Sequence, residues 1–268
     1  MIEPFLSPMP KVVAHRGDSH TYPENTLPAF TSARDMGVDV IETDVHLTKD
    51  AEVVIWHDST LDRNTDGSGR IEDYTLAELR TFDAGYTFTK DEGRSFPFRG
   101  KGIRMITLDE ALQSCPTQRF NVDLKSKDTR IVDAFTRVIR RNNAERRVLC
   151  ASFHLSHLKR IRKESPEILT SVTTAEVLPL LIQQKLNLLP RSFGPDRTLV
   201  FQVPVAQWGI KVITPRFIEE FHKRNAVIMV WTINEEEDME NLFDMGVDTI
   251  MSDNAELLIS VARRKDLM

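Results

Sequence analysis

The sequence predicts an α/β protein of the (β/α)8 TIM barrel class, with a small insertion after the second strand. Short β-rich runs alternate with helical patterns along the chain, as βαβ units around a parallel sheet require. Eight such runs can be counted, which suits a closed barrel better than an open doubly wound sheet. The length of 268 residues is typical of one barrel-sized domain with a continuous core.

The first βαβ unit can be read directly from the amino terminus. A strand at residues 12–14 precedes PENT at residues 23–26, which opens a helical stretch that runs to Met36. Gly37 then provides a helix stop, and a second strand follows at residues 38–44. The remaining strand candidates cover residues 119–124, 147–151, 168–172, 199–203, 227–231 and 248–251, and most are followed by a helical pattern.

An insertion interrupts this rhythm after the second strand. The sequence VHLTKDAEVVIWHD forms two strand-like arms about a turn at residues 49–52, with no room for a crossover helix, so we expect a β-hairpin. Residues 58–104 follow, with a turn-rich start, a possible short helix at residues 75–81 and an aromatic, glycine-bearing end. We expect a lobe over one barrel end, inserted into a single domain of residues 1–268.

Composition and charge exclude several classes of function. Lys and Arg number 35 against 40 Asp and Glu, and this net charge of -5 disfavours nucleic acid as a partner. Cys115 and Cys150 are too few to staple a secreted domain and lack metal-ligand spacing. No secretory signal and no apolar run of membrane-spanning length is found, so we expect a cytoplasmic protein without stable membrane insertion. The sequence leaves the oligomeric state open.

Strand alternation places two carboxylates on the same face. Val40, Glu42 and Asp44 point one way from the second strand, and the residues between them point the other way. Inside a barrel, repulsion and desolvation penalise both acids unless a cation intervenes. Oxygen ligands alone favour Mg²⁺ or Ca²⁺ over zinc. Lysine or arginine side chains inside the barrel are an equally good counter-charge, and this strand does not decide between the two.

Two histidines are expected at the same end of the barrel. Folding the hairpin about its turn sets His57 nearly opposite Asp44. His15 lies just past the end of the first strand, where barrel active sites form. Both histidines are therefore candidates for acid and base chemistry.

The strand at residues 119–124 adds a third acid and a cation. Alternation puts Asp123 and Lys125 on the same side. Together with Arg16, which follows the first strand, they suit a site that binds an anion through metal and basic side chains. Phosphate is the best candidate anion.

Four segments carry a resemblance to a known family: HRGDSHTYPENTLPAF, GVDVIETDVHLTKDAEVVIWHD, LDRNTDGSG and VWTINEEEDMENLFDMGVDTIMSD. The chain resembles the glycerophosphodiester phosphodiesterase family over nearly its whole length, because HRG followed by PENT, E-x-D and a closing HD is specific in combination. The resemblance implies a (β/α)8 barrel enzyme that hydrolyses a small-molecule glycerophosphodiester to sn-glycerol 3-phosphate and an alcohol.

The resemblance also implies a role for each candidate residue of the site. It implies one divalent cation, Mg²⁺ or Ca²⁺, with Glu42, Asp44 and Asp123 as its ligands, His15 and His57 as acid and base, Arg16 and Lys125 near the phosphate, and Trp231 lining the substrate. Trp231 could instead fill the barrel core. The family usually has glutamate at the position of Asp123, so direct ligation by this shorter side chain is less secure than ligation by the other two acids.

Several alternatives stay open at this point. A lysophospholipase D or related phospholipid phosphodiesterase would use the same scaffold, and its insertion would expose apolar residues, of which Phe82, Tyr86, Phe88, Phe96 and Phe98 are candidates. A non-catalytic phosphodiester-binding protein should have lost a histidine or a metal acid, and none is missing.

The order of the chemical steps is also open. We favour His57 as the base and His15 as the acid. Attack by water and attack by the adjacent glycerol hydroxyl through a cyclic phosphate are both compatible with the sequence.

Overall fold

Eight parallel strands of the computed structural model, which describes residues 3–193, 198–207 and 209–268, curve into a barrel in the order β6-β5-β4-β2-β1-β11-β10-β7. The strands are β1 (Val12–Ala14), β2 (Val40–Leu47), β4 (Arg119–Leu124), β5 (Val148–Ala151), β6 (Leu169–Thr170), β7 (Leu199–Val203), β10 (Ala226–Val230) and β11 (Thr249–Ser252). A single parallel bridge from Ser171 to Val200 joins the two edges of the sheet. The predicted barrel class is therefore confirmed.

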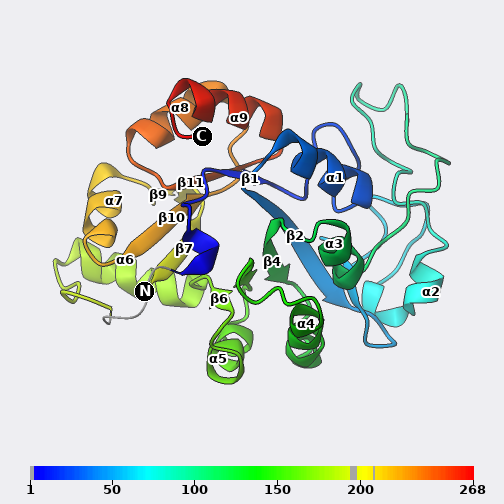
Figure 1. Cartoon of the computed structure of the whole chain (residues 1–268), viewed down its shortest axis with the longest axis horizontal. Helices are drawn as coiled ribbons and strands as arrows, with labels where there is room; N and C mark the ends of the chain where they lie inside the picture. Colours follow the sequence, from blue (N-terminus) through cyan, green and yellow to red (C-terminus); the bar gives the residue numbers. More distant parts are fainter. Residues whose placement is uncertain (1–2, 194–197, 208) are drawn as a thin grey trace.

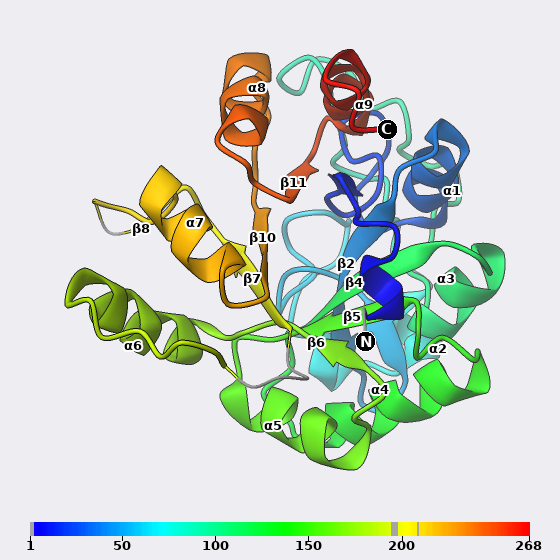
Figure 2. The same ribbon diagram turned by 60° about the vertical axis from the view of Figure 1, so that its left-hand side comes forward.

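Helices surround this sheet on its outer side (Figures 1 and 2). They are α1 (Leu27–Met36), α3 (Leu108–Ser114), α4 (Arg130–Arg141), α5 (Leu155–Glu164), α6 (Thr174–Lys185), α7 (Pro215–His222), α8 (Glu236–Asp244) and α9 (Ala255–Arg264). The first helix ends as the sequence predicts, because Gly37 adopts a left-handed conformation with φ 83°. No helix in the described part of the chain combines the length and the apolar character needed to cross a membrane.

Buried hydrophobic side chains form separate layers inside and outside the barrel. Val40 belongs to the interior cluster, on which the short helix η1 (Pro4–Leu6) also packs. Ile41, its neighbour in β2, belongs to the outer cluster between strands and helices. Because side chains alternate along a strand, Glu42 and Asp44 share the interior face of Val40, as the sequence predicts.

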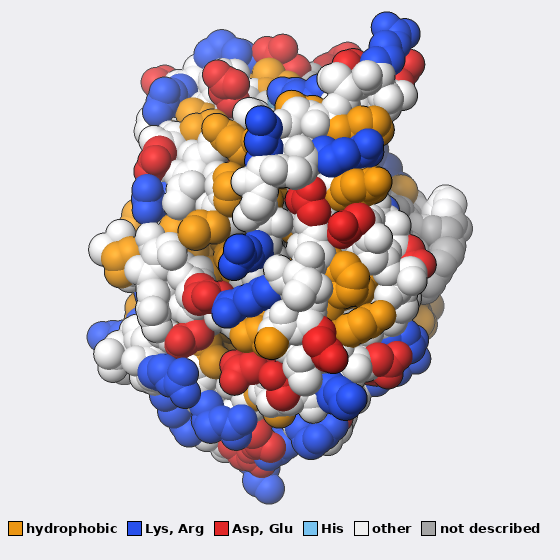
Figure 3. Space-filling view, turned by 90° about the vertical axis from the view of Figure 1, so that its right-hand side faces the viewer, with side chains coloured by type: hydrophobic (Ala, Val, Ile, Leu, Met, Phe, Trp, Pro, Cys, Tyr) orange, Lys and Arg blue, Asp and Glu red, His pale blue; other side chains and the backbone are white. Residues whose placement is uncertain are grey.

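The hairpin after the second strand carries a lobe on the right-hand side of Figure 1. β3 (Val53–Ile55) pairs antiparallel with β2 and sets Ile55 opposite Val45, so the predicted hairpin is confirmed. Residues 58–104 contain η2 (Ile71–Asp73) and α2 (Leu76–Leu79), which forms at the position predicted for a short helix. A separate small hydrophobic cluster joins this lobe to Val54 of β3. Basic and acidic side chains are interspersed over this face of the molecule (Figure 3).

A second, short hairpin follows β7. It consists of β8 (Ala206–Gln207) and β9 (Ile210–Lys211), which pair antiparallel outside the barrel sheet.

Candidate active site

The predicted site residues lie at the carboxyl ends of the barrel strands. His15 and Arg16 directly follow β1, and Trp231 directly follows β10. Glu42 and Asp44 lie in β2, Asp123 lies in β4 and Lys125 directly follows β4. His57 follows β3 of the hairpin. The register sets Asp44 directly opposite Asp123 on the neighbouring strand. Residues far apart in the sequence therefore meet at one barrel mouth, the end where barrel enzymes carry their active sites.

Two of the acids are almost completely buried next to each other. Glu42 is 5% exposed and Asp44 is 1% exposed. Burial, followed by the charge of Asp44, raises the pKa of Glu42 to about 8. Burial also disfavours the ionised form of Asp44, but the nearby charges of Lys125, His57 and Arg16 outweigh it, and the pKa of Asp44 is lowered. One acid is thus held as an anion beside another that resists ionisation.

Lys125 supplies the counter-charge between two strands. Its Nζ atom lies 3.0 Å from Asp44 Oδ1 and donates a hydrogen bond of 2.6 Å to Asp123 Oδ2. Burial opposes its charged form, but the charges of both aspartates raise its pKa. Interior pairing of an acid with a lysine, one of the two alternatives drawn from β2, is therefore present at Asp44.

The donor set of the three acids fits a hard divalent cation. Burial, together with the charge of Asp44, raises the pKa of Asp123, and its Oδ1 atom is buried without a hydrogen-bond partner among the described residues. All side-chain donors of the three acids are oxygens, which Mg²⁺ and Ca²⁺ prefer. Within residues 3–193, 198–207 and 209–268, however, no three acid, histidine or cysteine side chains already stand in a metal-holding arrangement. Lys125 pairs with both aspartates.

Each predicted catalytic histidine donates to an aspartate that the sequence analysis did not select. The distance from His15 Nδ1 to Asp253 Oδ1 is 2.6 Å, and that from His57 Nδ1 to Asp58 Oδ1 is also 2.6 Å. These bonds fix both imidazole rings with Nε2 free for chemistry, and His15 Nε2 lies 3.9 Å from Glu42 Oε2.

The carboxylates of Asp253 and Glu42 favour the protonated form of His15. Burial lowers the pKa of His15, but the hydrogen bond to Asp253 and the charge of Glu42 outweigh it, so that the pKa is raised. Burial opposes the ionised form of Asp253 too, but the hydrogen bond from His15 lowers its pKa to about 2.

The loop after β1 presents its backbone to the site. Arg16 has φ 57°, and its N–H group donates to Glu42 Oε2 at 3.1 Å. Asn25 has φ 59°; its side chain donates to Asp44 Oδ2 at 3.1 Å, and its N–H group donates to the Arg16 carbonyl at 3.0 Å. A left-handed conformation is uncommon for arginine and less so for asparagine, and at Arg16 it persists because surrounding bonds hold it. This loop is therefore held in one conformation by the acids of β2.

Trp231 stands apart from this hydrogen-bonded group. It is half-buried after β10 and packs against the interior cluster of the barrel. Its position is compatible with both predicted roles, since the side chain is only partly buried against that cluster.

The sequence contained signals for the missed residues. Asp58 directly follows His57, and Asp253 stands at the end of the last strand in the same position that His15 occupies after the first. Asn25 and Glu24 belong to the PENT segment, which is part of the family motif and lies shortly after HRG in the sequence.

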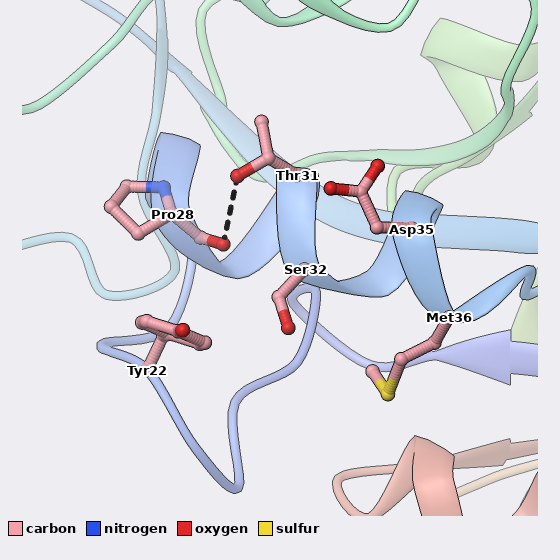
Figure 4. Close-up of a pocket in the computed structure, with 6 residues that line it drawn as sticks. All are labelled: Tyr22, Pro28, Thr31, Ser32, Asp35 and Met36. Carbon is pink, nitrogen blue, oxygen red and sulfur yellow. Dashed lines mark hydrogen bonds between the residues drawn. The ribbon is translucent and has the colours of Figure 1, made fainter.

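A hollow on the outer face of α1 is separate from this site. It has a volume of about 430 Å³ and is lined by Tyr22, Pro28, Thr31, Ser32, Asp35 and Met36, as the close-up in Figure 4 shows. None of the predicted site residues lines it, so the candidate active site rests on the strand ends and not on this hollow.

Comparison with known proteins identifies the family. The model of the glycerophosphoryl diester phosphodiesterase family matches residues 15–257. The chain belongs to this family. A glycerophosphodiester phosphodiesterase of Caldanaerobacter subterraneus subsp. tengcongensis is 33% identical over 94% of this chain and 98% of its own. Lysophospholipase D GDPD1 of Homo sapiens is 27% identical over 93% of this chain and 84% of its own.

A solved structure adds a bound product to the family comparison. It is an Oleispira antarctica phosphodiesterase in complex with sn-glycerol-3-phosphate, with 25% identity, a TM-score of 0.76 and coverage of 96% of this chain and 98% of that chain. The predicted membership of the family is confirmed, and so is the prediction that the chain is a phosphodiesterase enzyme.

Proposed function

We propose that this family member hydrolyses glycerophosphodiesters to sn-glycerol 3-phosphate and an alcohol, with histidine acid–base catalysis and a divalent cation. The observation that carries the proposal is the pair of aspartate-anchored histidines beside two buried acids, Glu42 and Asp44, at a site that also holds the partly buried Asp123 and two basic side chains. The names of the relatives and the product bound to the Oleispira antarctica enzyme support the substrate class.

Arg16 and Lys125 are the proposed phosphate-binding groups. The Nε atom of Arg16 is buried 3.6 Å from Asp44 Oδ2 and has no hydrogen-bond partner among the described residues, while its Nη1 atom donates to Glu24 at 2.9 Å. The Arg16 guanidinium is oriented by Glu24 through Nη1, and its Nε–H group still lacks an acceptor among the described residues. Such a group is suited to bind a phosphate oxygen. Trp231 would line the alcohol side of the substrate.

Glu42, Asp44 and Asp123 are the proposed ligands of Mg²⁺ or Ca²⁺. The cation, when bound, would supply positive charge that stabilises the phosphoryl oxygens during hydrolysis. Asn25 would then orient Asp44, because outer partners of a ligating carboxylate fix its direction.

The histidines divide the proton transfers in this proposal. The raised pKa of His15 favours its protonated form, so His15 protonates the departing alcohol oxygen. His57 accepts the proton of the attacking hydroxyl group, and Asp58 stabilises the imidazolium that results. When water attacks, the bond between phosphorus and the water oxygen forms while the bond to the alcohol oxygen breaks, and the alcohol leaves with the proton from His15. When the glycerol hydroxyl attacks, the same transfers give a cyclic phosphate, which water then opens to sn-glycerol 3-phosphate.

The lobe argues against the lysophospholipase D alternative. Three of its aromatic rings were candidates for an apolar surface and instead pack on neighbouring rings: Phe98 lies 5.5 Å from Tyr22 and 5.2 Å from Phe88, and Phe82 lies 5.6 Å from Tyr74. The large hydrophobic side chains that are exposed in the described residues lie outside the lobe. The packing of these rings on one another leaves less apolar surface for an acyl chain, and we favour a deacylated, water-soluble diester.

The test is product release by the purified protein. Glycerophosphocholine, glycerophosphoethanolamine and a lysophospholipid are each incubated with Mg²⁺, Ca²⁺ or a chelator, and sn-glycerol 3-phosphate or lysophosphatidate is measured. We expect sn-glycerol 3-phosphate from the first two substrates, and its loss with chelator. Phosphorus NMR during turnover distinguishes a transient cyclic phosphate from direct attack by water.

Histidine variants test the acid–base assignment in the same assay. His15→Ala and His57→Ala should each lower kcat by about 10²-fold, the usual scale for loss of an acid or a base. His222→Ala is the matched control, because His222 also pairs with an aspartate, Asp248, but lies at the end of α7. Near-normal turnover in His15→Ala or His57→Ala removes that residue from the mechanism, and binding without turnover in the wild-type protein supports a non-catalytic phosphodiester-binding protein.

A further inference from the structure

Arg63 of the lobe touches two carboxylates that serve different parts of the candidate site. We propose that Arg63 is a positioning residue, which fixes the orientation of both the catalytic His57 and the phosphate-binding Arg16. The proposal rests on the function proposed above, because it assigns Arg63 to the same reaction. It gives the lobe a part in catalysis.

The guanidinium of Arg63 bridges Asp58 and Glu24. Its Nε atom donates to Asp58 Oδ2 at 2.6 Å. Its Nη1 and Nη2 atoms donate to Glu24 Oε2 at 3.0 Å and to Glu24 Oε1 at 2.7 Å, which is a two-bond contact with one carboxylate. Such paired contacts fix direction as well as distance, because both groups are planar.

Each of these carboxylates also accepts a hydrogen bond from a residue of the candidate site and thereby orients its side chain. Asp58 accepts from His57 Nδ1 at 2.6 Å and so keeps the proton on Nδ1 and turns Nε2 outward. Glu24 accepts from Arg16 Nη1 at 2.9 Å through Oε1, the same oxygen that accepts from Arg63. A continuous chain of charged hydrogen bonds therefore runs from His57 to Arg16, with Arg63 at its centre.

Arg63 also neutralises two acids that would otherwise repel each other. Burial disfavours the ionised form of Glu24, but the hydrogen bond from Arg63 is the largest opposing effect, and the pKa of Glu24 is lowered. Burial acts on Asp58 in the same direction, and the hydrogen bonds from Arg63 and His57 lower its pKa to about 2. Without the Arg63 guanidinium, burial and mutual repulsion would disfavour the ionised forms of Glu24 and Asp58 in these positions.

The position of Arg63 distinguishes it from the site residues themselves. Its side chain is 46% exposed and belongs to the lobe that follows the hairpin, and its carbonyl accepts a hydrogen bond from Thr87 of the same lobe at 3.0 Å. It lies 39 residues from Glu24 in the sequence. The lobe and the loop after β1 therefore meet at this side chain, and the geometry of the site depends on both.

The test compares Arg63→Met with Arg70→Met. Arg70 is the matched control, since it belongs to the same lobe, is 53% exposed and pairs with one carboxylate, Glu72, at 2.7 Å. We expect Arg63→Met to lower kcat/KM by about 10- to 100-fold, the usual effect of removing an outer partner. Because Arg63 serves both His57 and Arg16, kcat should fall and KM should rise. Arg70→Met should stay within about twofold of wild type, as surface substitutions usually do.

Two further measurements separate positioning from stability. Arg63→Lys keeps the charge but not the planar fork, so it should recover only part of the activity. Arg63→Ala should regain activity when millimolar guanidinium is added, because the exposed position allows the free cation to enter, while the Tm of the variant stays close to that of wild type.

Proton NMR gives a readout that does not depend on turnover. A short bond from histidine to a carboxylate places the Nδ1 proton far downfield, and loss of the signal in His57→Ala assigns it. Arg63→Met should shift or broaden this signal, and Arg70→Met should not.

The outcomes decide between the two proposals. Activity of Arg63→Met that equals that of Arg70→Met, an unchanged His57 signal, or an activity loss that follows a fall in Tm without rescue by guanidinium would each overturn the role of Arg63. If the wild-type protein releases no product from any diester, the proposed function fails, and the His57 signal alone then decides whether Arg63 positions the imidazole.

Discussion

His15 and Asp253 stabilise each other's charged form across the ends of the first and last strands of the barrel. The N–H group of His15 donates to the Ser252 carbonyl at 2.9 Å, while its ring donates to Asp253, so backbone and side chain both join β1 to β11. Asn234 holds the second oxygen of Asp253 at 2.8 Å. The carboxylate is thus oriented from two sides, and His15 has one favoured position.

This pair predicts a pH dependence of stability. The pKa of Asp253 falls from an unfolded value of about 4 to about 2, so its contribution is full above about pH 4 and is lost as pH falls toward 2. The pKa of His15 is raised above 6.5, so its contribution is full below pH 6.5 and is lost as pH rises through the folded value. The pair therefore stabilises the fold most between these limits.

Asp253→Asn tests this dependence by calorimetry. The Tm of the variant should fall furthest below that of wild type near pH 5, and the difference should shrink in both more acidic and more alkaline buffer. A difference in Tm that is the same at every pH would show that the pair contributes through shape and hydrogen bonding alone.

At the scale of single residues, strand alternation was enough to place Glu42, Asp44, Asp123 and Lys125. The hairpin register likewise set His57 near Asp44, which the charge interaction between them reflects. The contacts of Arg63 could not be predicted in this way. They join residues of two loops, and no periodicity in the sequence reports where a loop side chain points.

Among the elements, the turn from β1 into α1 is the one on which the site depends most. Gly17 follows Arg16 in this turn and has φ 81°. A Cβ atom on Gly17 would lie 2.8 Å from the backbone carbon of Ala29 and 2.8 Å from a ring carbon of Phe30. Both of these neighbours belong to α1, so the turn has no room to adjust without moving the helix.

Gly17→Ala should therefore lower the free energy of unfolding by roughly 2–5 kcal/mol, the sum of a left-handed alanine and an overpacked contact. Gly37→Ala is the matched control: Gly37 has φ 83° and no atom within 4 Å of the added Cβ, so only the conformational cost of about 1–2 kcal/mol applies. Urea denaturation measures both. Equal losses in the two variants would show that the turn yields to the extra methyl group.

Element bounds were predictable where a strand keeps the same neighbours throughout. The predicted strands at residues 119–124 and 199–203 have the observed bounds. The second strand was predicted to end at residue 44 but continues to Leu47, because its last residues pair with β3. The strand predicted at residues 168–172 is reduced to β6, since Ser171 donates to Cys150 of one neighbour and Val172 donates to Val200 of the other.

At the scale of the whole molecule, the barrel brings together segments that span most of the sequence. Alternating βα units predicted this closure, because the carboxyl ends of parallel strands meet on one side. Physical reasoning from the sequence could not choose between a lysine and a metal ion as the counter-charge of the acids, since both satisfy the same electrostatic requirement. The single domain of residues 1–268, the inserted status of the lobe and the cytoplasmic location stay predictions.

A cation shared by β2 and β4 would stabilise the whole fold by mass action. At a concentration 100-fold above Kd, binding adds about 2.7 kcal/mol, which for a chain of this size raises Tm by roughly 5–10 °C. Lys125 is already paired with both aspartates, so the observed rise should be smaller if it competes with the cation. Thermal unfolding with Mg²⁺ or Ca²⁺, against NaCl of equal ionic strength, measures this gain without any assay of turnover.

Variants of Asp123 test whether the metal-dependent rise in Tm comes from binding at the proposed site. Asp123→Asn keeps the size of the side chain and deletes its charge, so it should need more metal for the same rise in Tm. Asp123→Glu restores the length usual in the family, and it should need less metal if the site is stretched and more if β4 has already moved toward β2. If Asp123→Asn responds to metal like wild type, Asp123 is not a ligand, and the site reduces to Glu42 and Asp44. If the wild-type protein shows no rise with either metal, Lys125 is the permanent counter-charge of these acids.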